Sequence, residues 1–191
     1  KFISGNDLRN LNGCEYRQMA NYIKNGTFEI NTPGNTGQIP QGWSVTSGSP
    51  DHQNDDTFEW SSYLERYFPT DLDAASGRGY FALSSGEEGS GAPYSEAAKT
   101  TLNTQIQSGE TYTFTFDFFV NSNADGTEPQ PSATELIVTI GSQQISVPLD
   151  STGVEAPYWQ SISFDFVAKE TTNTFSIGTD GVLDPSTGQP Y

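Results

Sequence analysis

The chain has 191 residues, with 8 Lys and Arg against 24 Asp and Glu, which gives a formal net charge of −16 at neutral pH. A surface this acidic repels phosphate backbones and anionic lipids, so the composition excludes nucleic acid as a partner and argues against a membrane surface. Apolar residues make up only 33 %, but 12 Phe and 9 Tyr are enough to fill the interior of one β-sandwich.

Residues 1–20 are polar and irregular, and we expect them to form an N-terminal arm ahead of a β-sandwich domain that covers residues 21–191. Residues 1–24 contain four basic and two acidic side chains (net +2), whereas the remainder contains 4 basic and 22 acidic ones (net −18). A basic arm on an acidic body either docks on a neighbouring copy or remains a solvated extension. The only cysteine, Cys14, lies in the arm, where it either pairs between chains or stays an inert thiol.

Two strands are predicted early in the chain, over residues 22–30 and 43–46. Residues 48–57 are predicted to form an acidic polar loop. Apolar side chains spaced at i, i+3, i+4 and i+7 then predict one short helix near residues 58–67, which would lie as a lid on the sandwich.

The middle of the chain contains the clearest strand pattern. Residues 79–83 are predicted to form a strand and residues 84–93 a loop rich in Gly, Ser and Glu. Strict alternation over residues 112–118 predicts a strand with one apolar face. The core face of that strand would carry Tyr112, Phe114, Phe116 and Phe118.

The last part of the chain predicts four more strands. Residues 133–140 and 143–148 form a predicted hairpin around Gly141-Ser142. Two strands follow over residues 158–168 and 172–178. Their inward side chains would be Ile162, Phe164, Phe166, Phe175 and Ile177. About nine strands with turn signals between them predict an all-β, antiparallel β-sandwich.

Five segments in this order carry a resemblance to a known family. They are Asn25–Glu29, Gly42-Trp43, Gly79–Leu83, Ser108–Phe114 and Trp159–Phe166. Together they resemble the galactose-binding-like jelly rolls, a superfamily of bacterial carbohydrate-binding modules and secreted surface domains. The resemblance implies a jelly-roll fold, a secreted or cell-surface location, Trp43 as a core plug, and a role as a module beside catalytic domains.

The same resemblance implies a structural metal. In relatives the Glu of the first strand commonly helps to hold Ca²⁺, so Glu29 is the expected metal ligand and Ca²⁺ the expected cofactor. Ca²⁺ takes 6–8 oxygen ligands, and this chain has many carboxylates. The family's last strand, which carries a further Asp ligand, has no counterpart in the sequence. Three sources could supply that strand: a segment outside this sequence, the arm of the same chain, or another subunit that adds a strand.

Side-chain chemistry predicts a binding module and not an enzyme. The single histidine, His52, is interpreted as a solvated loop residue, and neither a G-x-S-x-G motif nor a zinc motif is present. Sugar binding needs aromatic faces beside polar side chains. The candidate ligand-binding residues are Trp60, Tyr63, Tyr67, Asn54, Asp55 and Arg66. The alternative for the three aromatic residues is a helix face packed on the core.

The sequence therefore predicts a non-catalytic extracellular surface module that binds a polysaccharide or cell-surface glycan, or mediates adhesion, with Ca²⁺ near Glu29. The alternative is a structural subunit of an extracellular filament or appendage, in which identical subunits join by strand addition through the arm. No apolar run is long enough to span a bilayer, so no membrane insertion is expected.

Overall fold

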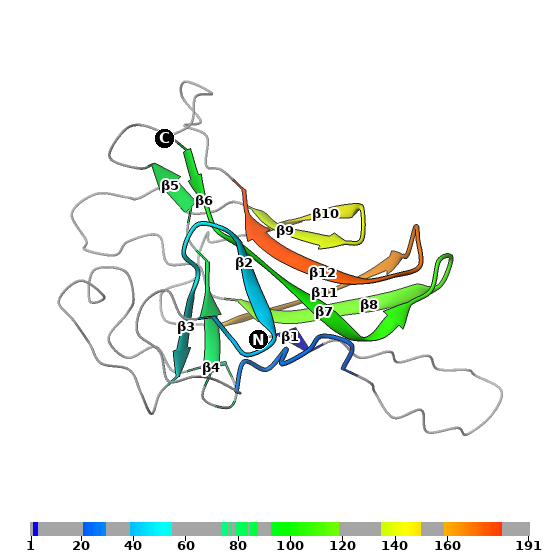
Figure 1. Ribbon diagram of the computed structural model, residues 1–191, viewed down its shortest axis with the longest axis horizontal. Coiled ribbons are helices and arrows are strands. Elements are labelled where there is room, and N and C mark those ends of the chain that lie inside the picture. Colours follow the sequence, from blue (N-terminus) through cyan, green and yellow to red (C-terminus); the bar gives the residue numbers. More distant parts are fainter. Residues whose placement is uncertain are drawn as a thin grey trace.

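In the computed structural model of the chain (Figure 1), the described residues are 2–3, 21–29, 39–54, 74–75, 77, 79–83, 85–87, 93–118, 135–149 and 159–180. Across these ranges the chain forms twelve strands and no helix, and every strand pair is antiparallel. The predicted all-β antiparallel sandwich is therefore confirmed. The helix expected near residues 58–67 lies outside the described residues.

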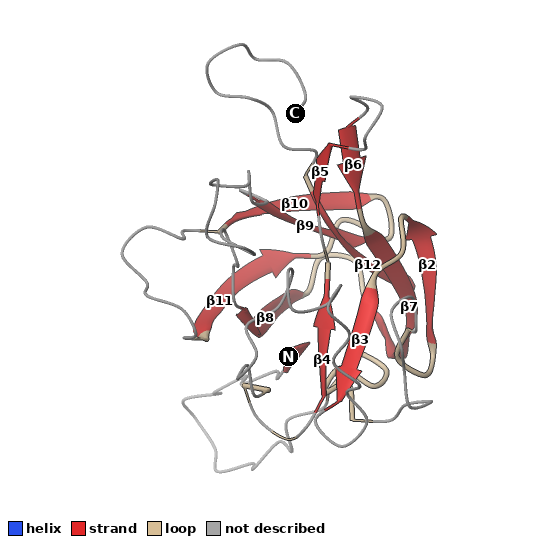
Figure 2. Cartoon of the chain, turned by 90° about the vertical axis from the view of Figure 1, so that its left-hand side faces the viewer, coloured by secondary structure: helices blue, strands red, loops and turns tan. Residues whose placement is uncertain are grey.

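Eight strands form the two sheets of the sandwich, and four short strands form two separate pairs (Figure 2). The five-stranded sheet has the order β10 (Gln143–Pro148), β9 (Glu135–Ile140), β12 (Thr172–Thr179), β7 (Ala97–Ile106) and β2 (Trp43–Ser47). The three-stranded sheet has the order β1 (Phe2–Ile3), β8 (Thr111–Phe118) and β11 (Gln160–Val167). The short pairs are β3 (Asp51–Asn54) with β4 (Gly79–Ala82), and β5 (Ser85–Glu87) with β6 (Pro93–Ser95).

Alternation in β8 and β11 places aromatic rings on one face of the three-stranded sheet, as predicted. The register sets Phe114 opposite Phe164 and Tyr112 opposite Phe166, so rings meet across the two strands. The buried or partly buried members of this face are Tyr112, Phe114, Phe116 and Phe118 of β8 and Ile162, Phe164 and Phe166 of β11. Polar side chains take the opposite face, which is why a period of two is enough to predict both strands.

Rings from both sheets meet in the core between them. The ring centroid of Phe175 of β12 lies 5.6 Å from that of Phe114 of β8 and 6.0 Å from that of Trp43 of β2. Phe28 continues this column, with its centroid 5.7 Å from Trp43. All four side chains are buried, so the expected role of Trp43 as a core plug is confirmed. The column joins the two sheets into one hydrophobic core.

The predicted hairpin near the end of the chain is confirmed. Gln143 of β10 lies opposite Ile140 of β9, which leaves Gly141-Ser142 as a two-residue turn. Gly141 has a φ of 61°, the left-handed conformation that such turns require and that glycine adopts without strain.

The strand predicted over residues 22–30 is wrong. Residues 21–29, which we call the plug segment, form turns, and Asn25 and Phe28 have φ angles of 48° and 57° that no strand accommodates. The apolar residues that suggested a strand, Ile23 and Phe28, are buried between the sheets instead. A main-chain hydrogen bond attaches the segment to β7: Asn103 N donates to the Tyr22 carbonyl oxygen at 2.7 Å.

Two of the predicted loops contain strands. Residues 48–57 include β3, and residues 84–93 include β5 and the first residue of β6. These strands are three or four residues long and rich in Gly, Ser and polar residues. Their hydrogen-bonded neighbours and not their own propensity produce them, so composition alone favoured loops.

The aromatic column predicts a large effect of truncating Phe175. We expect Phe175→Ala to lower the free energy of unfolding by about 3–5 kcal/mol, because it removes the ring that contacts both sheets and leaves a cavity. Urea unfolding followed by tryptophan fluorescence measures the change. The matched control is Ser176→Ala, whose side chain lies on the opposite face of β12 and whose effect should stay within about 0.5 kcal/mol. Equal effects of the two substitutions would contradict the assigned core.

Candidate functional site

The plug segment, β3 and β4 meet around the single histidine of the chain. His52 of β3 lies opposite Phe81 of β4 and is only 1 % exposed, so its interpretation as a solvated loop residue is wrong. Its Nε2 lies 2.9 Å from the carbonyl oxygen of Phe28. Because a carbonyl only accepts, Nε2 is the donor, and the neutral ring carries its proton there.

Glu29, the predicted metal ligand, turns back onto β4. Its Oε1 accepts a hydrogen bond from Gly79 N at 3.3 Å. A Cβ at Gly79 would stand 2.1 Å from the Phe28 carbonyl oxygen, so only glycine allows the plug segment to approach β4 this closely. A Cβ at Gly77, where φ is +69°, would likewise stand 2.1 Å from Glu29 Oε1. Gly79 therefore makes room for the Phe28 backbone, and Gly77 borders the Glu29 carboxylate.

The electrostatics of His52 follow from its burial. Loss of hydration lowers the pKa of the ring, while the Phe28 carbonyl and the charge of Glu29 act in the opposite direction with smaller effect. The ring is therefore held neutral in the folded protein at neutral pH. It fixes the Phe28 backbone, where the chain has an unfavourable positive φ, against β3.

A second polar contact, which is partly buried, holds the turn before β3. Glu96, which directly precedes β7, is 3 % exposed, and its Oε1 accepts hydrogen bonds from Ser49 N at 3.1 Å and from Ser49 Oγ at 3.4 Å. The backbone of Glu96 is bonded in turn to Thr179 at the end of β12. The turn that leads into β3 is thus tied to the five-stranded sheet. Sequence reasoning missed Glu96, because nothing in its neighbours distinguishes it from the many exposed acidic residues.

The structure places one of the six candidate ligand-binding residues. Asn54 is the last residue of β3 and lies opposite Gly79 of β4 in the register. The other five lie outside the described residues: Asp55, Trp60, Tyr63, Arg66 and Tyr67. Asp55 follows Asn54 directly in the chain, so the segment that contains these candidates begins where β3 ends. Whether their side chains gather in one place stays a prediction.

Ca²⁺ at Glu29 also stays a prediction. Glu29 offers a carboxylate, which accepts a hydrogen bond from Gly79 N as described above. Ca²⁺ needs 6–8 oxygens around it. Among the residues that the structure describes, no group of three or more His, Cys, Asp or Glu side chains is placed to hold a metal ion. A site at Glu29 therefore depends on backbone carbonyls or on ligands from beyond the described ranges.

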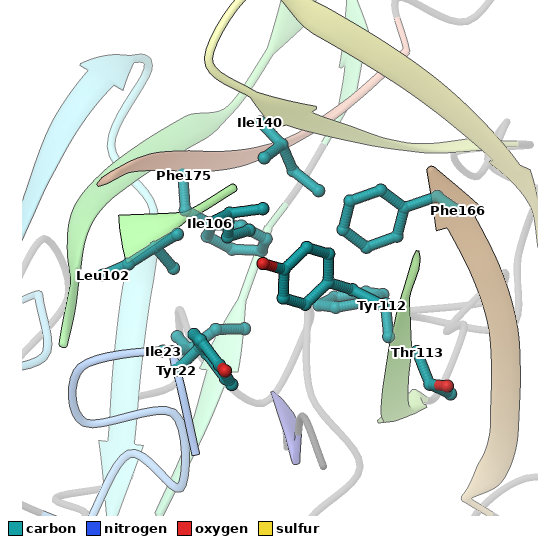
Figure 3. A pocket seen from close by; sticks show the side chains of 10 residues that line it. Tyr22, Ile23, Leu102, Ile106, Tyr112, Thr113, Ile140, Phe166 and Phe175 are labelled. Atoms are coloured by element: carbon teal, nitrogen blue, oxygen red, sulfur yellow. The ribbon is translucent and has the colours of Figure 1, made fainter. Parts of the chain in front are cut away.

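A small apolar cavity of about 20 Å³ lies in the sandwich interior beside the plug segment (Figure 3). Tyr22, Leu102 and Tyr112 are among its lining residues, and Tyr112 Oη already accepts a hydrogen bond from Gln107 N at 2.8 Å. A volume of this size holds about one water molecule, far less than a sugar ring needs. This cavity is therefore no glycan site.

No family model matches the chain, and no curated protein matches it. The resemblance to galactose-binding-like domains therefore rests on the five segments alone. Within the described ranges, no helix has the length and apolarity that crossing a membrane requires.

The buried histidine predicts a pH dependence of stability. The ring titrates near pH 6.5 in the unfolded chain, and burial lowers that pKa in the folded protein. The stabilisation is therefore complete above pH 6.5 and is lost as the pH falls through the lowered value, at up to about 1.4 kcal/mol per pH unit. Between about pH 7.5 and about pH 5.5, the free energy of unfolding should fall more steeply in the wild type than in His52→Gln.

Because His52 is the only histidine, the difference between the two proteins isolates its contribution. Urea unfolding at each pH gives the free energies, and the proton resonances of the ring report its charge directly. A ring that titrates in the folded protein at its ordinary pKa would contradict the buried neutral state.

Proposed function

We propose that the chain is a non-catalytic surface module, secreted or at the cell surface, that binds a polysaccharide or cell-surface glycan, or mediates adhesion. The observation that supports this proposal best is the set of polar contacts that hold β3 in place. Two polar contacts attach β3 to the rest of the protein: the buried bond from His52 to the Phe28 carbonyl, and the partly buried bond from Ser49 to Glu96. β3 ends at Asn54, so the segment with the other candidates begins at a strand that these contacts hold in place, as a preorganised binding site requires.

The state of the histidine supports a role without catalysis. General acid–base chemistry needs a titratable group within reach of a substrate. His52 is fully buried, and one of its two nitrogens is engaged with the backbone. It serves the attachment of β3 and is not available to a substrate.

The outer face of β8 and β11 is a poor glycan platform. Its polar side chains already bond to one another across the strands: Thr113 Oγ1 donates to Asp165 Oδ1 at 2.6 Å, and the hydroxyls of Thr115 and Ser163 are 2.9 Å apart. Ser161 donates to Asp117 in the same row. A sugar hydroxyl would have to replace these bonds, so binding there gains little.

Glycan binding is tested by substituting the aromatic candidates. We expect Trp60→Ala and Tyr63→Ala each to lower the affinity for a glycan identified on an array by about tenfold or more, because each removes a stacking surface. The control is Val167→Ala, which shortens an exposed side chain of β11 and should leave affinity unchanged.

The melting temperature of each variant separates the two interpretations of these rings. If they pack on the core, the alanine variants lose stability together with binding. If they form the binding surface, stability is kept and only affinity falls. Full affinity in both variants would contradict the proposed site.

The expected Ca²⁺ makes a separate prediction. A ligand present at about 100 times its Kd adds about 2.7 kcal/mol of stability, so saturating Ca²⁺ should raise the melting temperature by about 5–10 °C over that in EDTA. Glu29→Gln keeps an oxygen that can accept from Gly79 N but removes the charge, and should abolish the rise. Scanning calorimetry measures it, with Mg²⁺ as the control ion. Identical melting in Ca²⁺ and EDTA would rule the metal out.

One observation favours the second candidate function, a structural subunit of an extracellular filament or appendage. Residues 2–3, which belong to the predicted arm, form β1 and pair with β8, with Phe2 opposite Phe116 and Ile3 opposite Thr115. The arm therefore contains a segment that adds a strand to the sandwich. Strand addition is the step that such a filament requires.

A further inference from the structure

The arm meets the sandwich through main-chain pairing at one sheet edge. β8 has β11 on one side and β1 on the other, and β1 covers two of its eight residues, Thr115 and Phe116. Pairing of this kind depends on backbone N–H and C=O groups, which every copy of the chain presents in the same register. Phe2 and Ile3 of a second copy therefore fit the same edge as well as those of the first.

The connection between β1 and the body is long enough for exchange. Seventeen residues, 4–20, separate Ile3 from the first residue of the plug segment. A chain of that length can reach about 60 Å when extended. A compact protein of 191 residues has a radius of gyration of about 16 Å, so this reach is more than three times that radius.

The charge of the arm is compatible with a second copy as the occupant. Residues 1–20 contain three basic and two acidic side chains (net +1), while residues 21–191 contain 5 basic and 22 acidic ones (net −17). The only charged residues of β8 and β11 are Asp117 and Asp165, both acidic. A basic arm is thus attracted to the acidic body of any copy, and two bodies that would otherwise repel each other gain a bridge of opposite sign.

We propose that β1 exchanges between copies of this chain, so that Phe2 and Ile3 of one copy pair antiparallel with Phe116 and Thr115 of β8 in another. This inference rests on the second candidate function and names its acceptor strand, register and partner. A two-residue ladder holds the arm weakly on its own body, so exchange responds to concentration. It becomes dominant when the density of copies approaches the effective concentration of the tethered arm, on the order of millimolar.

Disulfide trapping between two single-cysteine proteins tests the proposal. Both carry Cys14→Ser; one also carries Ile3→Cys and the other Thr115→Cys. Opposite residues of an antiparallel pair have Cα atoms about 4.5–5.5 Å apart, within the range that a disulfide bridges. When the two proteins are mixed with oxidised glutathione, any bond that joins them has formed between copies.

The matched control replaces Thr115→Cys by Ser163→Cys. Ser163 lies beside Thr115 on the same face but one strand farther from β1, at about 10 Å, which is too far for a disulfide. We expect the position 3–115 heterodimer to form at least about tenfold faster than the 3–163 heterodimer, with a yield that rises with protein concentration.

Light scattering gives a second measurement on chains with the native cysteine. Phe2→Pro together with Ile3→Pro removes whichever N–H faces β8, and should reduce the mass of the assembled species toward the monomer. Phe2→Val with Ile3→Val keeps both N–H groups and should assemble as the wild type does.

Two results would overturn the proposal. One is a heterodimer rate equal to that of the control pair at every concentration, while the Ile3→Cys/Thr115→Cys double variant closes its disulfide within one chain. The other is a wild type that stays monomeric to millimolar concentration. Glycan binding by that monomer would leave the surface-module function standing, so the two failures are distinguishable.

Discussion

Phe175 of β12 and Phe114 of β8 pack with ring centroids 5.6 Å apart. Their two sheets have no strand in common, so side-chain packing of this kind joins them. Trp43 and Phe28 extend it toward the plug segment. The position of β3 depends on the column, because His52 bonds to the carbonyl of Phe28, whose ring is the last of the four. Hydrophobic packing of a few rings therefore determines where the polar contacts of the candidate site lie.

Segments with a period of two were predictable from sequence, since burying one face leaves a clear alternation. This holds for β8, β11 and β12. It also holds for the hairpin of β9 and β10, because its turn residues, Gly141-Ser142, favour a two-residue turn. The plug segment was not predictable, because its buried residues Ile23 and Phe28 follow the shape of the gap that they fill and not a repeat. β3, β5 and β6 were missed because such short polar strands depend on the neighbour that each one finds in the folded protein.

The polar contacts that hold the candidate site carry no sequence signature at all. His52 and Glu96 bond to backbone groups of Phe28 and Ser49, which lie 24 and 47 residues away along the chain. Any acidic residue or histidine can make such a bond, so only the fold shows which one does. The resemblance did direct attention to Glu29, and the structure shows its carboxylate beside Gly77 and bonded to the backbone N–H of Gly79.

β12 lies between β7 and β9 in the five-stranded sheet, although the other four strands all precede it in the chain. Its pairings, such as Phe175 with Thr100, join residues far apart in sequence, and such pairings make folding slow. During translation the sheet cannot close until residues 172–179 have left the ribosome. Until then β7, which at ten residues is the longest of the described strands, lacks β12 as its neighbour. The net charge of −16 opposes contact between copies while that edge is incomplete, because like charges repel before the fold forms as well as after it.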